Sequence, residues 1–362
     1  MDGSVQQRKL KLKKVTTTTA LSPLALLTLA ACGGVGNGGP TVSGSSSTVV
    51  SGNAIKGPLD NAFVFIDSNE NGVWDTGEAS DLTDSDGDYS ISASASGKLL
   101  VTEDPNGTTT DTSTGLALAG FSMSAPDGAT VITPFTTLMA DGGMTAEELA
   151  QGLGLDADID PLNFNPFADG VDAAAALSAE KLAHQVFNVV TSYADSASAI
   201  GEDVDSGAAF KAAMQAVAEV AKTAAASSEL IDLSDSDDLA SVQAQAITSL
   251  TELDSDLGEA AFGNYLDSVT LGIKNVNAQV AAADSLTSDA AKTLFGLGSS
   301  LREQVSTGAE AEKAAPGTGA NSIAFKSAAS VNEEAGDAAV EVREVSGKVL
   351  LGPIKSALVW LD

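Results

Sequence analysis

The pattern of apolar residues changes abruptly near residue 134, and this change most limits the folds open to the chain. From 48 to 133, short runs rich in β-branched and aromatic residues alternate with turns made of Gly, Asn, Asp and Pro. After that point, apolar residues recur at steps of three and four in Ala-rich segments. A period of two predicts strands and a period near 3.6 predicts amphipathic helices. We therefore expect an α+β multidomain protein, with a small antiparallel β-sandwich over 48–133 and an Ala-rich α-helical bundle over 134–305.

The expected elements follow from these patterns. The predicted strands are Val49–Ile55, Ala62–Ile66, Tyr89–Ala93, Leu99–Glu103, Ala117–Met123 and Ala129–Ile132. A capping box, Thr145 followed by Glu148, opens a short helix. Four longer helices are marked by the stripes Leu182, Val186, Val189, Tyr193; Phe210, Met214, Val217, Ala221; Tyr265, Val269, Ile273, Val276, Val280; and Leu294, Leu297, Leu301, Val305. A bundle of about five helices is expected, with these stripes forming its core.

An acidic loop after the second predicted strand is the most specific chemical motif of the chain. It runs from Asp67 to Glu78, with side-chain oxygens at loop positions 1, 3, 5, 9 and 12 and Gly72 at position 6. This is the EF-hand loop spacing, in which Ca²⁺ binds about six to eight oxygens and glycine allows a sharp turn. The predicted calcium ligands are Asp67, Asn69, Asn71, Val73 through its carbonyl, Asp75 and Glu78. The alternative is a polar turn without metal.

The surroundings of this loop differ from those of an EF-hand. A strand leads into it, and residues 79–81 leave it without helical periodicity. The loop is therefore expected to be a structural calcium clip and not a sensor. Asp84, Asp86 and Asp88 follow closely, and we interpret them as a solvated acidic turn in preference to further ligands.

Residues 57–89 resemble the prealbumin-like modules of bacterial surface adhesins. The likeness rests on Gly57-Pro58-Leu59, on the calcium loop and on Thr83-Asp84 before Gly87 and Tyr89. Two later pieces, 131–138 and 165–170, are similar to large proteins of marine bacteria in which such a head precedes cadherin-like repeats. The resemblance implies an adhesive cell-surface protein with calcium as its cofactor.

Residues 1–31 have the organisation of a bacterial signal peptide. Basic residues lie in the first 14 positions and an apolar run, Ala20–Ala31, follows. This run is too short to span a bilayer, which takes about 20 apolar residues. It ends in Leu29-Ala30-Ala31-Cys32, which resembles the lipobox of bacterial lipoproteins, in which the cysteine is acylated. Because Gly33 and not Asp follows Cys32, the resemblance predicts a lipid anchor in the outer membrane. The alternative interpretation of Cys32 is a buried free thiol.

The remaining segments complete the expected domain order. Residues 32–47 are a Gly/Ser-rich tether, and residues 306–322 an Ala/Gly/Glu linker. Residues 323–362 read as the start of a second, truncated β module, because Ser346–Asp362 matches Ser51–Asp67 at seven of 17 positions. We therefore expect this repeat to belong to a longer protein.

Composition excludes several function classes. A formal charge of −31 argues against nucleic acid, because a phosphate backbone is bound by basic surfaces. His184 is the only histidine and Cys32 the only cysteine, so we expect neither a Ser-His-Asp triad nor a zinc site with histidine ligands inside one chain. No pair of carboxylates stands out either. We expect no enzyme.

The predicted function is that of a calcium-binding cell-surface lipoprotein, an adhesion or scaffold module. Its partners would be the membrane, through the N-terminal lipid, and other cell-surface proteins or polysaccharide. The alternative is an outer-membrane lipoprotein that faces the periplasm and binds a polysaccharide or envelope partner.

The anchoring prediction can be tested with Cys32→Ser. Expressed with its own leader in a Gram-negative host, the wild-type chain should incorporate labelled palmitate and sediment with the outer membrane. Cys32→Ser should do neither, because serine offers no thiol for acylation. Equal labelling of both chains would contradict the lipobox interpretation.

Overall fold

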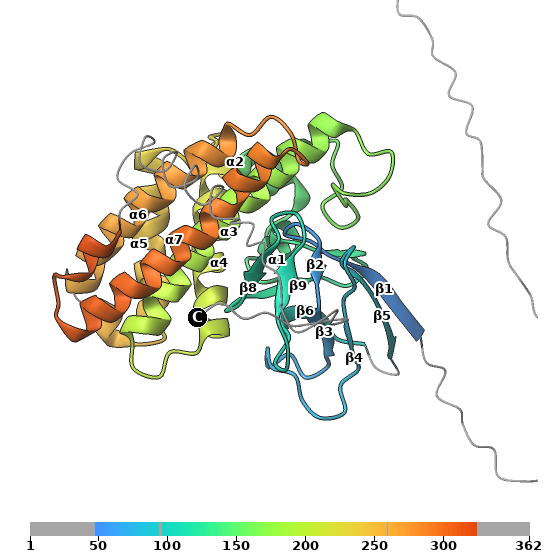
Figure 1. Ribbon diagram of the computed structural model, residues 1–362, viewed down its shortest axis with the longest axis horizontal. Coiled ribbons are helices and arrows are strands. Elements are labelled where there is room, and N and C mark those ends of the chain that lie inside the picture. Colours follow the sequence, from blue (N-terminus) through green and yellow to red (C-terminus); the bar gives the residue numbers. More distant parts are fainter. Residues whose placement is uncertain (1–47, 94–95, 259, 324–362) are drawn as a thin grey trace, which may run out of the picture. The chain divides into compact units, whose positions relative to one another are not determined.

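Three small sheets make up the N-terminal part of the computed structural model, which describes residues 48–93, 96–258 and 260–323 (Figure 1). The first has the order β10-β1-β5 and the second β4-β3-β6-β9, and the third has the order β2-β7-β8. The strands are β1 (Thr48–Ala54), β2 (Leu59–Asp60), β3 (Ala62–Asp67), β4 (Ser80–Leu82), β5 (Asp88–Ala93), β6 (Lys98–Glu103), β7 (Thr109–Asp111), β8 (Leu116–Leu118), β9 (Ser122–Ala125) and β10 (Val131–Ile132). All ladders are antiparallel except β1 with β10.

The two larger sheets contribute to one core. In β5 every second residue is buried, so that Tyr89, Ile91 and Ala93 point inward while the residues between them are exposed. Val64 of β3 and Val101 of β6 belong to the same hydrophobic cluster. The alternation that predicted strands therefore also set which face of each strand is covered.

Seven α-helices follow the strands within the described residues. They are α1 (Pro134–Ala140), α2 (Ala146–Leu153), α3 (Ala173–Ile200), α4 (Ser206–Ala226), α5 (Ser236–Thr251), α6 (Ala260–Ala281) and α7 (Asp289–Ala314), with 3₁₀ turns η1 (Ser255–Gly258) and η2 (Gly319–Ser322). Thr145 and Glu148 form the predicted capping box of α2. Asp172, Asp205 and Asp235 cap α3, α4 and α5 by accepting from free backbone N–H groups. The α+β class is thereby confirmed.

The helix α3 lies at the centre of the bundle. It packs against α4, α6 and α7, and the strands and helices share one hydrophobic core within one compact unit. Apart from Leu182 and Leu294, which are half-buried, the four predicted apolar stripes are buried. No described helix combines the length and hydropathy that crossing a bilayer demands.

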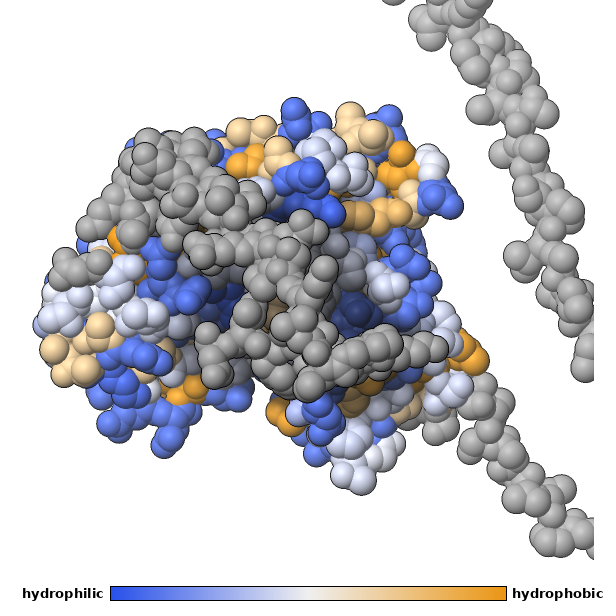
Figure 2. Space-filling view, viewed as in Figure 1, coloured by the Kyte–Doolittle hydropathy of each residue, from blue (hydrophilic) through white to orange (hydrophobic). Residues whose placement is uncertain are grey.

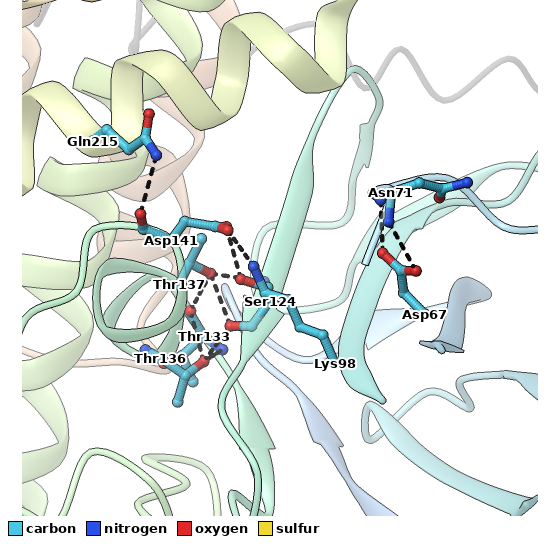
Figure 3. Close-up of polar contacts among 10 residues, drawn as sticks. Asp67, Asn71, Lys98, Ser124, Thr133, Thr136, Thr137, Asp141 and Gln215 are labelled. Carbon is cyan, nitrogen blue, oxygen red and sulfur yellow. Dashed lines mark hydrogen bonds and ion pairs between the residues drawn. The ribbon is translucent and has the colours of Figure 1, made fainter. Parts of the chain in front are cut away.

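A network of hydroxyl groups joins the last strands to the first helix (Figure 3). Thr133 caps α1, and its side chain and that of Thr136 close a reciprocal capping box. Thr137 Oγ1 accepts from the Ser124 backbone N–H at 3.0 Å, and Ser124 Oγ donates to Asp141 at 2.7 Å. Lys98 forms an ion pair with the same Asp141 carboxylate. These hydrogen bonds and this ion pair connect the strands β6 and β9 to the helix α1.

Three sequence expectations need correction. The described residues form seven α-helices where about five were expected: α1 is only seven residues long, and the α5 stripe Leu239, Val242, Ala246 and Leu250 was not singled out. The single strand expected over Ala117–Met123 is two, because Gly120 adopts φ +60 and sends β8 and β9 into different sheets. The linker expected over 306–322 begins as helix, because α7 continues to Ala314 with Gly308, Ala309 and Glu312 buried. Glu312 then accepts from the backbone N–H groups of residues 317 and 319, which closes the helix end.

Several earlier predictions lie outside the described residues. They are the signal peptide 1–31, the acylated Cys32, the tether 32–47 and nearly all of the second module 323–362. They stay predictions.

Close approach of helices through small residues gives a stability prediction. A Cβ atom added at Gly152 in α2 would lie 2.2 Å from the carbonyl oxygen of Ala221 in α4. Gly152→Ala should therefore lower the free energy of unfolding by about 1–3 kcal/mol, because backbone must move to admit the methyl group. Urea denaturation measures this change.

The matched control is Gly263→Ala. Gly263 also lies in a helix, α6, but an added Cβ there meets only Ile247 at an ordinary 3.8 Å. Alanine at this position should leave stability unchanged or raise it by up to about 1 kcal/mol through helix propensity. Equal effects at the two positions would show that the α2–α4 contact is looser than described.

Candidate functional site

The loop predicted to bind calcium connects β3 to β4 and is anchored by its first residue. Asp67 ends β3 and is 1% exposed. Its Oδ1 accepts from the backbone N–H of Asn71 at 3.2 Å and its Oδ2 from that of Gly72 at 2.7 Å (Figure 3). Gly72 has φ +82, a conformation that costs glycine little. The carboxylate at loop position 1 therefore holds the turn at positions 5 and 6.

The side chains at loop positions 3, 5 and 9 contact one another. Nδ2 of Asn69 and Nδ2 of Asn71 both donate to Oδ2 of Asp75, at 2.7 and 2.8 Å. The Oδ1 atoms of the same two asparagines accept from the backbone N–H groups of Asn71 and Val73. Three of the predicted ligands thus gather at one point of the loop.

Glu78, at loop position 12, folds back over the loop. Its Oε1 accepts from the backbone N–H of Ser68 at 2.7 Å, and its Oε2 accepts from that of Asp75 at 3.0 Å. Slight desolvation raises the pKa of Glu78, but the N–H groups of Asp75 and Ser68 outweigh it and hold that pKa below its ordinary value. The carboxylate is therefore available in its charged form, the form that binds a cation.

These residues fit a calcium ion in donor type and in their order around the turn. The predicted ligands at Asp67, Asn69, Asn71, Asp75 and Glu78 carry oxygen side chains, and all are linked through the loop hydrogen bonds above. The carboxylates of Asp67, Asp75 and Glu78 all accept from N–H groups of the loop. Within the described part of the chain, no three acidic, histidine or cysteine side chains lie close enough together to hold a metal ion. Val73, predicted to bind through its carbonyl, is 63% exposed. Calcium binding remains a prediction.

An aromatic residue of the loop was not singled out from the sequence. Trp74, at loop position 8, donates from Nε1 to the carbonyl of Glu78 at 3.2 Å. Its ring stands edge-on to Phe63 of β3, with centroids 5.7 Å apart, and 42% of the residue is exposed. The loop therefore presents an indole on the surface of the sheet.

The acidic turn after β4 is held by backbone hydrogen bonds. Asp84 Oδ1 accepts from the N–H groups of Asp86 and Asp88, both at 3.0 Å. Asp88 also accepts from the Asn53 side chain on β1. This geometry suits the interpretation as an acidic turn.

A second polar group, formed by Lys56, Asp111, Glu180 and His184, lies in the interior, and we call it the buried charge cluster. It joins the turn after β1, the strand β7 and the helix α3, and each of its four residues is 4% exposed or less. Lys56 Nζ lies 2.8 Å from Asp111 Oδ2 and 5.4 Å from the centre of the Phe187 ring.

Glu180 and His184 complete the buried charge cluster from the helical side. Glu180 Oε1 accepts from the backbone N–H of Gly57 at 2.8 Å and lies 3.1 Å from His184 Nε2, without hydrogen-bond geometry to it. The imidazole stacks on Phe295 of α7 with centroids 4.4 Å apart. The only histidine of the chain is therefore enclosed between Glu180 of α3 and Phe295 of α7.

Burial determines the protonation of this cluster. It raises the pKa of Glu180 to about 8, with the neighbouring charge of Asp111 adding to the effect, and it lowers the pKa of His184 well below its ordinary value. Burial also raises the pKa of Asp111, but the charge of Lys56 outweighs it and the net pKa is lowered. At neutral pH the cluster therefore holds one ion pair, a protonated Glu180 and a neutral His184.

No sequence signal pointed to the buried charge cluster. Lys56, Asp111 and Glu180 are separated by more than 50 residues each and belong to no common motif. Gly57 has φ +66 and leaves no room for a side chain beside Asp111, but this constraint is visible only in the structure.

Comparison with known proteins finds no match: no family model, no curated protein and no solved structure is similar to the chain.

The raised pKa of Glu180 predicts a pH dependence of stability. The folded state keeps a proton on Glu180 that the unfolded chain releases above its ordinary pKa of 4.5. The contribution of Glu180 to the free energy of unfolding is fully present below pH 4.5. It is lost as the pH rises towards about 8, by up to about 1.4 kcal/mol per pH unit. Glu180→Gln should remove this slope, because glutamine stays neutral.

Urea unfolding at a series of pH values from 5 to 9 (on the order of half-unit steps) measures the slope as a difference between variant and wild type. Glu229→Gln is the control, since Glu229 is exposed and makes no part of the cluster. Parallel pH profiles for Glu180→Gln and wild type would contradict the prediction.

Proposed function

We propose that the chain is a calcium-binding cell-surface lipoprotein that acts as an adhesion or scaffold module. The observation that carries the proposal is the loop from Asp67 to Glu78, whose oxygen-bearing side chains at positions 3, 5 and 9 meet through Asp75. Asp67 and Glu78 close the two ends of the same turn. Such an arrangement suits a hard cation that prefers oxygen ligands.

A calcium ion bound there would neutralise the carboxylates that the loop brings together. The chain itself contributes by connecting the loop to two paired strands. Asp67 ends β3 and the loop returns into β4, which pairs with β3 in the register Phe63 to Leu82 and Phe65 to Ser80. Fixing the loop therefore fixes a short edge strand that has few hydrogen bonds of its own.

The same loop shapes a surface for a partner. Trp74 and Leu82 are each more than 40% exposed and adjoin Phe63 on the outer side of the β3–β4 pair. Aromatic residues that are partly exposed are common contact residues in protein interfaces. On the face seen in Figure 2, hydrophilic residues surround scattered apolar ones. A small aromatic contact beside the loop suits a partner that binds next to a calcium-ordered loop.

Location at the cell surface rests on the signal peptide and the lipobox cysteine, which lie outside the described residues. A lipid anchor with a flexible tether would hold the described unit away from the membrane. Protease treatment of intact cells tests the orientation, since only an outward-facing chain is cleaved.

Calcium titration of the chain without its signal peptide tests the proposal. Calorimetry should show saturable binding, and the midpoint of thermal unfolding should rise with calcium, because the ion binds only the folded loop. Fluorescence of Trp74, followed in a Trp360→Phe background, should report the same transition. A flat response in all three measurements, in calcium and in chelator, would falsify the metal site.

Variants sharpen this test. Asp67→Ala and Glu78→Ala should each lose binding, because they remove the oxygens at the two ends of the loop. Asp86→Ala is the control, since Asp86 is an exposed acid of the neighbouring turn and should leave binding unchanged. Equal weakening by all three would mean that calcium is attracted by the acidic surface in general and not by the loop.

A further inference from the structure

A cleft of about 710 Å³ lies where the sheet that contains β6 and β9 meets the helices α1 and α4. Its volume falls within the range of about 300–1,000 Å³ that is usual for sites that bind small molecules. The cleft is lined by residues of the loop Asp67–Glu78, of β6, of the turn after β9, of the C-terminal end of α1 and of α4. None of these lining residues is a predicted calcium ligand, so the cleft is a separate site beside the loop.

Two lysines line this cleft, although the chain is strongly acidic. The sequence holds 18 basic and 49 acidic residues, so composition alone does not lead one to expect two lysines at one site. Lys98 lies at the start of β6 and forms an ion pair with Asp141, which neutralises it. Lys211 lies on α4, is exposed, and makes no side-chain ion pair or hydrogen bond within the described residues. The cleft therefore keeps one ammonium group available to a ligand.

Hydrogen bonds fix one wall of the cleft in the absence of a ligand. Oδ2 of Asp141 accepts from Ser124 Oγ at 2.7 Å, and its Oδ1 contacts Lys98. The backbone carbonyl of Asp141 accepts from Nε2 of Gln215 at 3.2 Å, and Figure 3 shows Asp141 between Lys98 and Gln215. No described residue donates to Oε1 of Gln215, which can therefore accept from a ligand hydroxyl group. A wall held in this way loses little conformational freedom when a ligand binds.

Two exposed carboxylates complete the polar lining. Glu70 belongs to the loop and Asp127 to the turn after β9, and neither side chain makes a hydrogen bond to another described residue. Ionised carboxylates only accept hydrogen bonds, so they suit the hydroxyl groups of a sugar. Together with Asp141 they set three acids against two lysines, which disfavours phosphate and other multiply charged anions. A ligand with several hydroxyl groups and a single negative charge matches this lining.

We propose that the cleft binds a short saccharide that carries a single carboxylate, such as a uronate ring next to a neutral sugar. The ligand carboxylate pairs with Nζ of Lys211. Ring hydroxyl groups donate to Oε1 of Gln215 and to the carboxylates of Glu70 and Asp127. This inference names a ligand class for the proposed adhesive function and rests on that function only in taking the saccharide from a cell surface.

The cleft is in direct contact with the loop Asp67–Glu78. A Cβ atom added at Gly97, which lines the cleft, would lie 2.4 Å from the carbonyl oxygen of Asp67. Ser68, on the same lining, donates through N and Oγ to Oε1 of Glu78 at 2.7 and 3.0 Å. Calcium binds the oxygens of sugar carboxylates as well as those of proteins. Binding to the cleft itself is therefore measured in chelator, where no calcium can bridge the saccharide to the loop.

Calorimetric titration of the chain without its signal peptide tests the proposal with cellobiouronate, a disaccharide of glucuronate and glucose. In chelator, binding should be saturable and should weaken as salt is added, because its main contact joins opposite charges. Cellobiose has a hydroxymethyl group in place of the carboxylate, so it should bind at least about tenfold more weakly, as expected for loss of one charge-assisted contact. Absence of saturable binding, or equal affinity for the two disaccharides, overturns the proposal. Neither result depends on whether the loop binds calcium.

Variants locate the binding site. Lys211→Ala should lower the affinity for cellobiouronate at least about tenfold and leave that for cellobiose unchanged, because only the carboxylate contacts the ammonium group. Lys292→Ala is the matched control, since Lys292 is also an exposed helical lysine without an ion pair in the described part of the chain, but it lies on α7 outside the cleft. This control should bind as wild type does. Equal losses in the two variants overturn the assignment to the cleft, with circular dichroism confirming that both are folded.

Discussion

Burial of α3 on nearly every side is the constraint on which the rest of the structure depends. The polar side chains of a helix enclosed in this way depend on partners inside the protein, because water is excluded. Several of them have such partners, whereas His184 and Ser192 make no side-chain hydrogen bond. Asn188 finds Asn277 of α6, Tyr193 finds Thr270 of the same helix, and Glu180 finds the backbone of Gly57 in the β part. Each of these contacts fixes the rotation of a neighbouring element and its position along the α3 axis. The sheets and the helical bundle are thereby held in a fixed position relative to α3.

Small side chains make this close packing possible. Alanines make up much of the buried faces of α3 and α4. Glycines of the neighbouring helices add to this: Gly152 of α2 meets the Ala221 backbone, and Gly298 of α7 faces Asn188 at a distance that admits no Cβ. Short interhelical distances bring backbones together and leave little space for aromatic residues, which is consistent with an aromatic content of 4%. The few large side chains, such as Phe187 and Phe210, pack against each other where the helices meet the β part.

The loop Asp67–Glu78 and the buried charge cluster accommodate carboxylates in two different ways. Both place carboxylates in a chain that already carries a large negative charge. At the surface, the loop carboxylates are satisfied by N–H groups and lie open to a cation, whereas in the interior the cluster removes charge by a proton on Glu180 and by the lysine beside Asp111. Solvent access decides which solution is available.

The sequence by itself determined many of the elements and the candidate loop, because these depend on local spacing. Period-two runs placed β1, β3, β5 and β6, and the apolar stripes placed α3, α4, α6 and α7, since side-chain direction follows backbone geometry over a few residues. The positions from Asp67 to Glu78 could be read as a ligand set for the same reason. Only the tertiary structure decided that β1 pairs in parallel with β10, that residues 117–123 divide between two sheets and that α7 runs past Val305. It alone brought Lys56, Asp111 and Glu180 together, because pairing between distant segments depends on the shape of the whole core and leaves no periodic trace in the chain.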